Sequence, residues 1–318
     1  MKVTEHFQAE ANKTLISFEV LPPLKGGGMK SIFEALDPLM EFNPPFVDVT
    51  YHREEFVYKR RPSGYYEKTS IRKRPGTVGI CAAIMHKYGI DAVPHLICGG
   101  FSKEDTENVL IDLNFLDINN LLALRGDAQK FEDKFLPEPN GNAFALDLVK
   151  QIEAMNQGTY LDSNIINGEK TNFCIGVAGY PEKHFEAPNL ELDLQFTKQK
   201  VESGASYIVT QMFFDNQRYF DYVAACRNAG ISVPIVPGLK PLTKRSQLSA
   251  IPRKFFINFP SELIGELSKC KDDNSFKQVG IEWSIAQSKE LKSKGVPCLH
   301  YYTMGDTDTI CQIAQNVF

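Results

Sequence analysis

Six polar positions in this chain lie at or just after the ends of short apolar runs: Glu19, Thr50, His95, the Arg125–Asp127 segment, Tyr180 and Gln211. His184, Asp193 and Lys200 follow the fifth of these runs. Together they offer carboxylates, imidazoles, hydroxyl and amide groups and cations, but no serine or cysteine activated as a nucleophile. Such a set can orient a bound cofactor, meet its phosphates and manage one proton, while the cofactor carries the redox chemistry.

Each of these residues also has a purely structural explanation. A carboxylate such as Glu19 can cap the loop that follows its strand, His95 can be a hydrogen-bonded core histidine, and Lys200 can be a solvated helix residue. His95 and Cys98 are three positions apart, but no third and fourth ligand accompanies them, so no metal site is expected. The sequence also lacks a phosphate-binding loop, a Gly-x-Ser-x-Gly nucleophile elbow and a His-Glu-x-x-His helix.

The elements that must position these residues are repeated β–α units. Short apolar runs alternate with segments of helical period, and eight such units fit the chain. We therefore predict a single (β/α)8 TIM barrel over residues 1–318, with the polar groups around the rim formed by the C-terminal strand ends. A doubly wound open sheet is the rival fold, but no Gly-x-Gly-x-x-Gly follows the first strand. The predicted strands cover about residues 14–20, 46–51, 91–98, 120–125, 172–178, 206–213, 233–239 and 298–303.

Two insertions, residues 52–75 and 128–142, follow the second and fourth predicted strands, so the fold prediction includes two long loops on the rim. Loops of this length in a compact domain are usually lids or binding segments. Residues 59–74 hold seven lysines and arginines, with three tyrosines among or beside them. This basic loop could bind a polyanionic substrate tail or a cofactor phosphate. It could equally be a solvated loop or an oligomer contact, and the sequence leaves both open.

Composition limits the partners and the compartment. The formal net charge of −4 argues against general nucleic-acid binding, which favours a strongly basic surface. The seven cysteines form no Cys-x-x-Cys pair, which indicates reduced thiols in a reducing compartment. No apolar stretch reaches about 18 residues, and the N-terminus lacks a signal-peptide pattern. We therefore expect a cytoplasmic protein without a membrane partner.

Eight short motifs, each weak alone, occur in order at the predicted strand ends. They are Ser17-Phe18-Glu19, Val49-Thr50-Tyr51, Pro94-His95-Leu96-Ile97-Cys98, Leu124-Arg125-Gly126-Asp127, Tyr180-Pro181-Glu182, Thr210-Gln211, Pro237-Gly238 and Tyr301-Tyr302-Thr303. Together they resemble the methylenetetrahydrofolate reductase family across the whole predicted barrel. The resemblance is to the short microbial form, which has the catalytic barrel without a C-terminal regulatory domain.

The resemblance implies an activity: FAD-dependent reduction of 5,10-methylenetetrahydrofolate to 5-methyltetrahydrofolate by ping-pong hydride transfer. The FAD would be non-covalent, the reductant NADH or NADPH, and the assembly a homo-oligomer. Glu19 and Asp127 would be catalytic, with Glu19 as the general acid that assists ring opening at N10. Such an acid must be protonated near neutral pH, so we expect a partly desolvated Glu19 with a raised pKa.

The family's binding residues carry over position by position. The implied FAD contacts are Thr50, His95, Leu124, Arg125, Gly126, Asp127, Ala145, Tyr180, His184, Glu186, Asp193 and Lys200. The implied folate contacts are Glu19, Asp127, Gln211 and Gln247.

This chain departs from the family at three places. His52 follows Tyr51 where the family often has glycine, Phe144 replaces a usual tyrosine, and Thr303-Met304-Gly305-Asp306 lacks a usual arginine. That arginine grips the folate tail in the family, and the basic loop could substitute for it.

Two other functions remain as alternatives. One is a non-flavin barrel aldolase or isomerase, which would need a Schiff-base lysine or a phosphate site after the last strands, where this chain offers Pro237-Gly238-Leu239-Lys240. The other is a folate- or flavin-binding subunit without turnover. Detection of bound flavin would distinguish a reductase from the aldolase or isomerase. Measured turnover would distinguish a reductase from the binding subunit.

Overall fold

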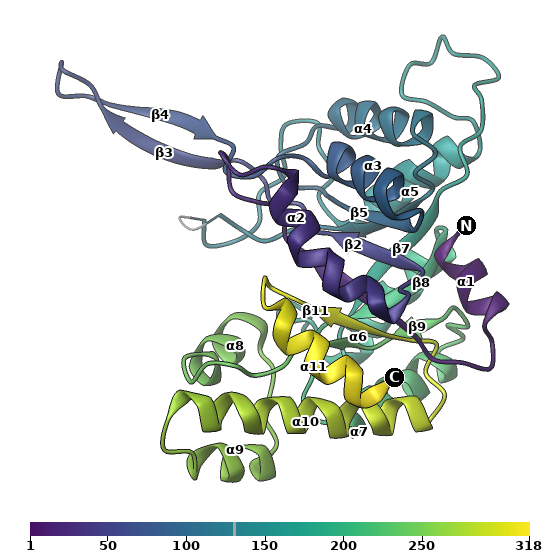
Figure 1. The fold of residues 1–318 in the computed structure, drawn as a ribbon. Coiled ribbons are helices and arrows are strands. Elements are labelled where there is room, and N and C mark those ends of the chain that lie inside the picture. Colours follow the sequence, from purple (N-terminus) through teal and green to yellow (C-terminus); the bar gives the residue numbers. More distant parts are fainter. Residues whose placement is uncertain (130–131) are drawn as a thin grey trace.

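The computed structural model describes residues 1–129 and 132–318 and centres on one parallel sheet that curves into a barrel (Figure 1). The nine strands of this sheet follow the order β10-β11-β1-β2-β5-β6-β7-β8-β9. Their bounds are β1 Leu15–Val20, β2 Phe46–Val49, β5 Asp91–Ile97, β6 Asn120–Leu124, β7 Cys174–Gly179, β8 Ala205–Thr210, β9 Ile235–Val236, β10 Gly238–Leu239 and β11 Cys298–Tyr302. All pairings in this sheet are parallel, which confirms the predicted barrel class.

The predicted seventh strand is split at Pro237 into β9 and β10, and the split lets the barrel close. β9 pairs with β8, whereas β10 pairs with β11. Pro237 has no N–H for a ladder, but its carbonyl accepts from His300 N at 3.1 Å. The hydroxyl of Tyr302 also donates to the Thr210 carbonyl at 2.6 Å, so side chains complete the closure.

Helices cover the outside of the barrel, and apolar residues of both layers form its main core. Ser102 caps the third predicted helix by accepting from Asp105 N, as the sequence indicated. The helices that follow strands are α2 Met29–Leu36, the 3-10 helix Asp37–Phe42, α3 Thr77–Tyr88, α4 Lys103–Phe115, α5 Ala145–Asn156, α6 Leu190–Glu202, α7 Asn216–Asn228, α8 Gln247–Phe255, α9 Ser261–Ser268, α10 Asp273–Ser293 and α11 Thr307–Val317.

A further helix, α1 (Val3–Ala9), precedes the first strand and was not predicted. Its Val3 and Phe7 are buried against the strand residues Phe46, Val93 and Leu122. These partners lie in different strands, so their gathering depends on barrel closure. The helix therefore packs against strand residues well before the rim, which leaves the rim to the polar groups.

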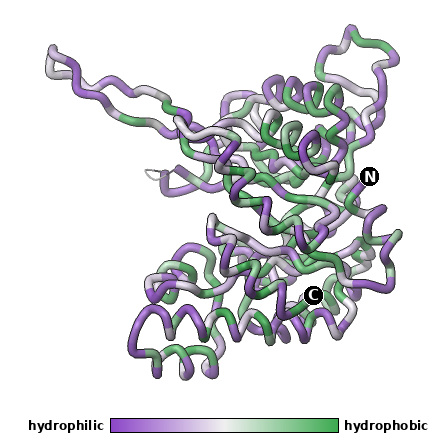
Figure 2. Tube along the Cα trace, viewed as in Figure 1, coloured by the Kyte–Doolittle hydropathy of each residue, from purple (hydrophilic) through white to green (hydrophobic). Residues whose placement is uncertain are grey.

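The insertion after β2 is not the loop that we predicted but a two-stranded antiparallel hairpin, β3 (Glu55–Arg60) and β4 (Tyr66–Ile71). It projects away from the barrel (Figure 1), and much of its length is polar in Figure 2, where the barrel strands are mostly hydrophobic. The other insertion, 128–142, has no regular element in its described part, and residues 130–131 lie outside the described residues. Among the described residues, no helix combines the length and apolar character needed to cross a bilayer.

Candidate active site

The acid predicted at the rim, Glu19, lies in a small buried cluster with Asp48 and His95. Their strands β1, β2 and β5 are neighbours in the sheet, and Glu19 is directly in register with Asp48. His95 Nε2 lies 3.6 Å from Glu19 Oε2 and 3.4 Å from Asp48 Oδ2. The side chains of Glu19 and Asp48 are only 12% and 1% exposed. The strand pairing thus places two carboxylates and one imidazole inside the barrel.

Burial makes Glu19 an acid suited to neutral pH. Desolvation raises the pKa of Glu19 from 4.5 to about 7, opposed by His95 and Lys240 and reinforced by Asp48. The backbone around it is fixed, because Thr303 donates to the Glu19 carbonyl through both its N–H, at 3.2 Å, and its hydroxyl, at 2.8 Å. The expected elevation of this pKa is therefore present in the structure.

A second polar group follows β6. The Arg125 side chain is 19% exposed and makes an ion pair with Glu186. The centre of the Phe135 ring lies 5.2 Å from its guanidinium carbon. Gly126 adopts φ +87°, a conformation that other residues rarely adopt, and its missing Cβ would lie 3.4 Å from Ile97. The backbone therefore turns tightly here, and Arg125 is held by a carboxylate and an aromatic face.

Residues after β7 extend this group. The ring of Tyr180 lies 4.6 Å from that of His184, measured between ring centres. The backbone N–H of His184 donates to the Asp193 carboxylate at 2.9 Å. Burial, with help from Arg125, lowers the pKa of His184 to about 4, so its imidazole is neutral. Lys200 donates to the Ala178 carbonyl at 2.8 Å, and burial lowers the pKa of its ammonium to about 8.

The other predicted site residues lie around the same strand ends. Thr50 is buried and its N–H donates to the Val20 carbonyl at 3.1 Å, while Gln211 N donates to the Gly179 carbonyl at 2.8 Å. Asp127 is 78% exposed and lies 3.4 Å from Lys254 of α8. Gln247 uses its amide oxygen to accept from Thr243 N and Lys244 N, so it stabilises its own turn.

Leu124 ends β6, and Ala145 is the first residue of α5. Phe144, which replaces the family's usual tyrosine, is 60% exposed.

Sequence reasoning assigned no role beside Glu19 to three polar residues that lie near it: Asp48, His300 and Lys240. Asp48 and His300 lie inside apolar runs, so they were interpreted from the sequence only as parts of predicted strands. Each of them is 1% exposed in the structure. Lys240 follows β10, and burial lowers its pKa, opposed by Asp306 and Glu19. A charged residue in the middle of a predicted strand was the signal that could have found Asp48.

The kinds of residue present fit a bound FAD. Arg125, Lys200 and the neutral His184 lie within one electrostatic neighbourhood, because Arg125 and Lys200 both lower the pKa of His184. Fixed cations and ring N–H donors are what a pyrophosphate requires. Tyr302 is close to both this group and the acid. Burial is the main cause of its raised pKa, and Glu19, Asp48 and Tyr180 raise that pKa further. Among the described residues, no group of three or more His, Cys, Asp and Glu side chains is arranged so that it could hold a metal ion.

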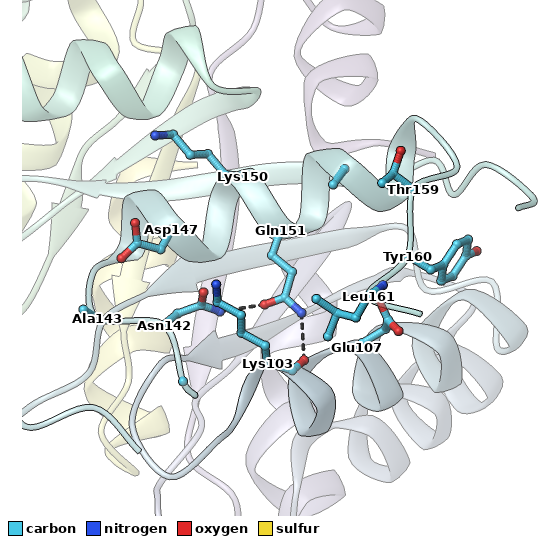
Figure 3. Close-up of a pocket in the computed structure, with 12 residues that line it drawn as sticks. Lys103, Glu107, Asn142, Ala143, Asp147, Lys150, Gln151, Thr159, Tyr160 and Leu161 are labelled. Atoms are coloured by element: carbon cyan, nitrogen blue, oxygen red, sulfur yellow. Dashed lines mark hydrogen bonds between the residues drawn. The ribbon is translucent and has the colours of Figure 1, made fainter. Parts of the chain in front are cut away.

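A pocket with a volume of about 500 Å³ lies away from this site, between α4, α5 and the segment that follows α5 (Figure 3). Its floor is already hydrogen-bonded: Asn142 donates to Gln151 at 2.7 Å, and Gln151 donates to the Lys103 carbonyl at 2.7 Å. Glu107 accepts from Leu161 N at 2.8 Å. It contains neither Glu19 nor His95, so it is not the place where the acid acts.

The barrel and its rim define a class of protein, the (β/α)8-barrel enzyme with a buried carboxylic acid, Glu19, near the C-terminal strand ends. The family within this class is shown by comparison with known proteins. Residues 2–317 match the family model of methylenetetrahydrofolate reductase, and the chain belongs to this family.

Curated relatives agree with this assignment. The chain is 31% identical over 329 residues to methylenetetrahydrofolate reductase (NADH) 1 of Arabidopsis thaliana, a match that covers 100% of this chain and 51% of that protein. It is 30% identical over 292 residues to 5,10-methylenetetrahydrofolate reductase of Pectobacterium carotovorum, with 91% of this chain and 85% of that protein covered. The chain thus spans about half the length of the plant relative and most of the bacterial one.

A solved structure shares the fold. It is an uncharacterized protein from Clostridium thermocellum, described as binding two copies of 5-methyl-5,6,7,8-tetrahydrofolic acid. The TM-score is 0.59 at 13% sequence identity, and the match covers 99% of this chain and 98% of that one. At this identity the likeness concerns the fold alone.

Proposed function

We propose that this protein reduces 5,10-methylenetetrahydrofolate to 5-methyltetrahydrofolate, with FAD as a non-covalent cofactor and NADH or NADPH as the electron donor. The observation that carries the proposal is Glu19, a buried carboxylic acid at the barrel rim with a pKa of about 7, in a chain that belongs to the reductase family. Bound FAD would supply the hydride-transfer chemistry that links the nicotinamide to the folate.

The chain's own acid serves the folate half of the reaction. At neutral pH, Glu19 retains a proton on its carboxyl group because burial opposes ionisation. It donates this proton to N10 of the substrate, where the C–N bond of the five-membered ring breaks. Gln211, which follows β8, and Gln247 of α8 orient the folate in this proposal.

The residues after β6 and β7 serve the cofactor. Arg125, His184 and Lys200 hold the pyrophosphate, while Thr50, His95, Leu124, Gly126, Ala145, Tyr180, Glu186 and Asp193 complete the binding site. Asp127 lies beside the isoalloxazine in this proposal. A carboxylate there disfavours added negative charge and so lowers the reduction potential.

The compartment and the assembly belong to the same proposal. All seven cysteines are unpaired, which fits the reducing cytoplasm. A homo-oligomer is the proposed assembly, and light scattering of the purified protein would measure its mass.

The first experiment is spectroscopic. Purified protein should absorb near about 370 and 450 nm from bound flavin, a general property of that cofactor. Acid precipitation should release the flavin into the supernatant, where chromatography identifies it as FAD. A colourless protein that cannot be loaded with FAD would favour the aldolase or isomerase. Loaded protein that binds folate without turnover would be a binding subunit.

A further inference from the structure

The buried Asp48 has no role in the site as described so far, yet it lies at the same level as Glu19. The two residues are register partners on the adjacent parallel strands β1 and β2, and their side chains both approach His95 Nε2. His95 comes from β5, the next strand in the sheet. Three ionisable groups from three consecutive strands therefore share one point inside the barrel.

Asp48 depends on that imidazole. Both of its carboxylate oxygens are buried, and neither has a well-aligned hydrogen bond among the described residues. An ionised carboxylate in such a place is costly unless a charge compensates it. The Nε2 atom of His95, at 3.4 Å, is the ionisable nitrogen within ion-pair distance of Asp48 in the part of the chain that the structure describes, and it compensates the carboxylate only when the imidazole is protonated.

We propose that Asp48 is a positioning residue that holds His95 as an imidazolium, so that a positive charge faces the carboxyl group of Glu19. The proposal rests on Glu19 acting as the acid. When Glu19 gives its proton to N10, the O–H bond of the acid breaks and an N–H bond forms. The new carboxylate then lies 3.6 Å from His95 Nε2, which keeps its own proton. Without that cation, proton transfer would leave the carboxylates of Glu19 and Asp48 side by side with no positive charge shared between them.

The electrostatics of His95 agree with this arrangement. Burial by itself lowers the pKa of His95, but its contact with Asp48 and the charges of Glu19 and Asp48 outweigh burial and raise it. His52 follows β2 and interacts electrostatically with His95. Burial, Arg74 and His95 together lower the pKa of His52. The cation is therefore expected on His95 and not on His52.

The remaining groups around the cluster do not supply the positive charge that Asp48 lacks. His300 of β11 exchanges a hydrogen bond with Ser17 through Nδ1 at 2.8 Å, and burial lowers its pKa. Burial raises the pKa of Tyr207 on β8 and of Cys81 on α3, and raises that of Cys298 on β11 to about 12. Tyr302 is held neutral in the same way. Lys240 faces Glu19 and Asp306, so it does not neutralise Asp48.

Nitrogen NMR of the purified flavoprotein, labelled with [15N]histidine, tests the proposal directly. The chain has six histidines. The signals lost in His95→Gln identify His95, and His86→Gln, which removes an exposed histidine, is the matched assignment control. We expect His95 to carry protons on both ring nitrogens at pH 7. In Asp48→Asn, the proton affinity of His95 should fall on the order of tenfold or more, because the adjacent carboxylate is gone.

A neutral His95 at pH 7 in the wild-type protein would overturn the proposal, even if Asp48→Asn fails to fold. An unchanged His95 titration in a folded Asp48→Asn would overturn it as well. A merely structural Asp48 would lower stability without moving the titration of His95.

The reaction gives an independent readout. With His95→Gln, Glu19 stays beside an uncompensated Asp48 carboxylate, so the pH profile of folate reduction should move to higher pH. A profile that stays in place would contradict the proposed link between His95 and Glu19. If Glu19 were not the acid, the NMR result would still stand, so the two failures can be told apart.

Discussion

Replacing Glu19 by glutamine is expected to stabilise the folded protein above neutral pH, although it should abolish folate reduction. Burial raises the pKa of Glu19 in the folded state from 4.5 to about 7. A raised carboxyl pKa means that the stability contributed by the protonated form is fully present below pH 4.5 and is lost as the pH rises through 7. At pH 8 the wild-type protein must hold an ionised carboxylate in a buried site, whereas glutamine is never ionised.

The gap between 4.5 and about 7 corresponds to about 3 kcal/mol at pH 8. Urea unfolding gives the free energy of unfolding of the wild-type protein and of Glu19→Gln at pH 5 and at pH 8. The change between the two pH values in the difference between the two proteins measures the cost of burying the ionised carboxylate. Glu34→Gln is the matched control: Glu34 is exposed and forms a surface pair with Lys30, worth a few tenths of a kcal/mol. If the stability difference for Glu19→Gln does not become more favourable from pH 5 to pH 8, the carboxyl is not desolvated and the reasoning fails.

Three further outcomes are expected. Replacing Arg72–Arg74 at the base of the hairpin by glutamines should raise the Michaelis constant more for polyglutamylated than for monoglutamylated folate, increasingly so at low salt. The same change at Lys59–Arg61, near the projecting tip, is the control, and equal effects on both substrates would remove the hairpin from folate binding. Lys200→Met should weaken FAD binding by tenfold or more in a flavin fluorescence titration, and wild-type affinity should fall above pH 8 as the ammonium loses its proton; unchanged affinity would contradict its phosphate role. Gly126→Ala should lower the free energy of unfolding, measured by urea titration, by about 1–2 kcal/mol because φ there is +87°; a neutral effect would show that the turn adapts.

The barrel could be predicted from the sequence because the long strands are single apolar runs that carry a polar residue at or near their C-terminal ends. The segment around His95 shows this: the predicted strand 91–98 and the observed β5, Asp91–Ile97, differ by one residue. Ser102 likewise carried its own local signal as a helix cap. The local sequence pattern was sufficient to predict those strands and helix ends whose position is determined by neighbouring residues in the chain.

The rest depends on contacts between distant segments. Asp48 looked like a strand residue, and only the pairing of β2 with β1 on one side and with β5 on the other shows that it shares one imidazole with Glu19. Helix α1 gains its core through barrel closure, which no local pattern reports. The hairpin did carry a signal, Pro62-Ser63-Gly64 between two β-prone runs, but its high charge made it read as a loop.

Anaerobic stopped-flow kinetics of Glu19→Gln test the central claim most directly, because the enzyme's two half-reactions can be followed separately by flavin absorbance. Reduction by NADH or NADPH should stay close to wild type, since that step moves a hydride and needs no acid at this position. Reoxidation by 5,10-methylenetetrahydrofolate should slow by about 10²–10⁴-fold, the usual contribution of a positioned acid. Equal slowing of both half-reactions, or of neither, would show that Glu19 is not the proton donor.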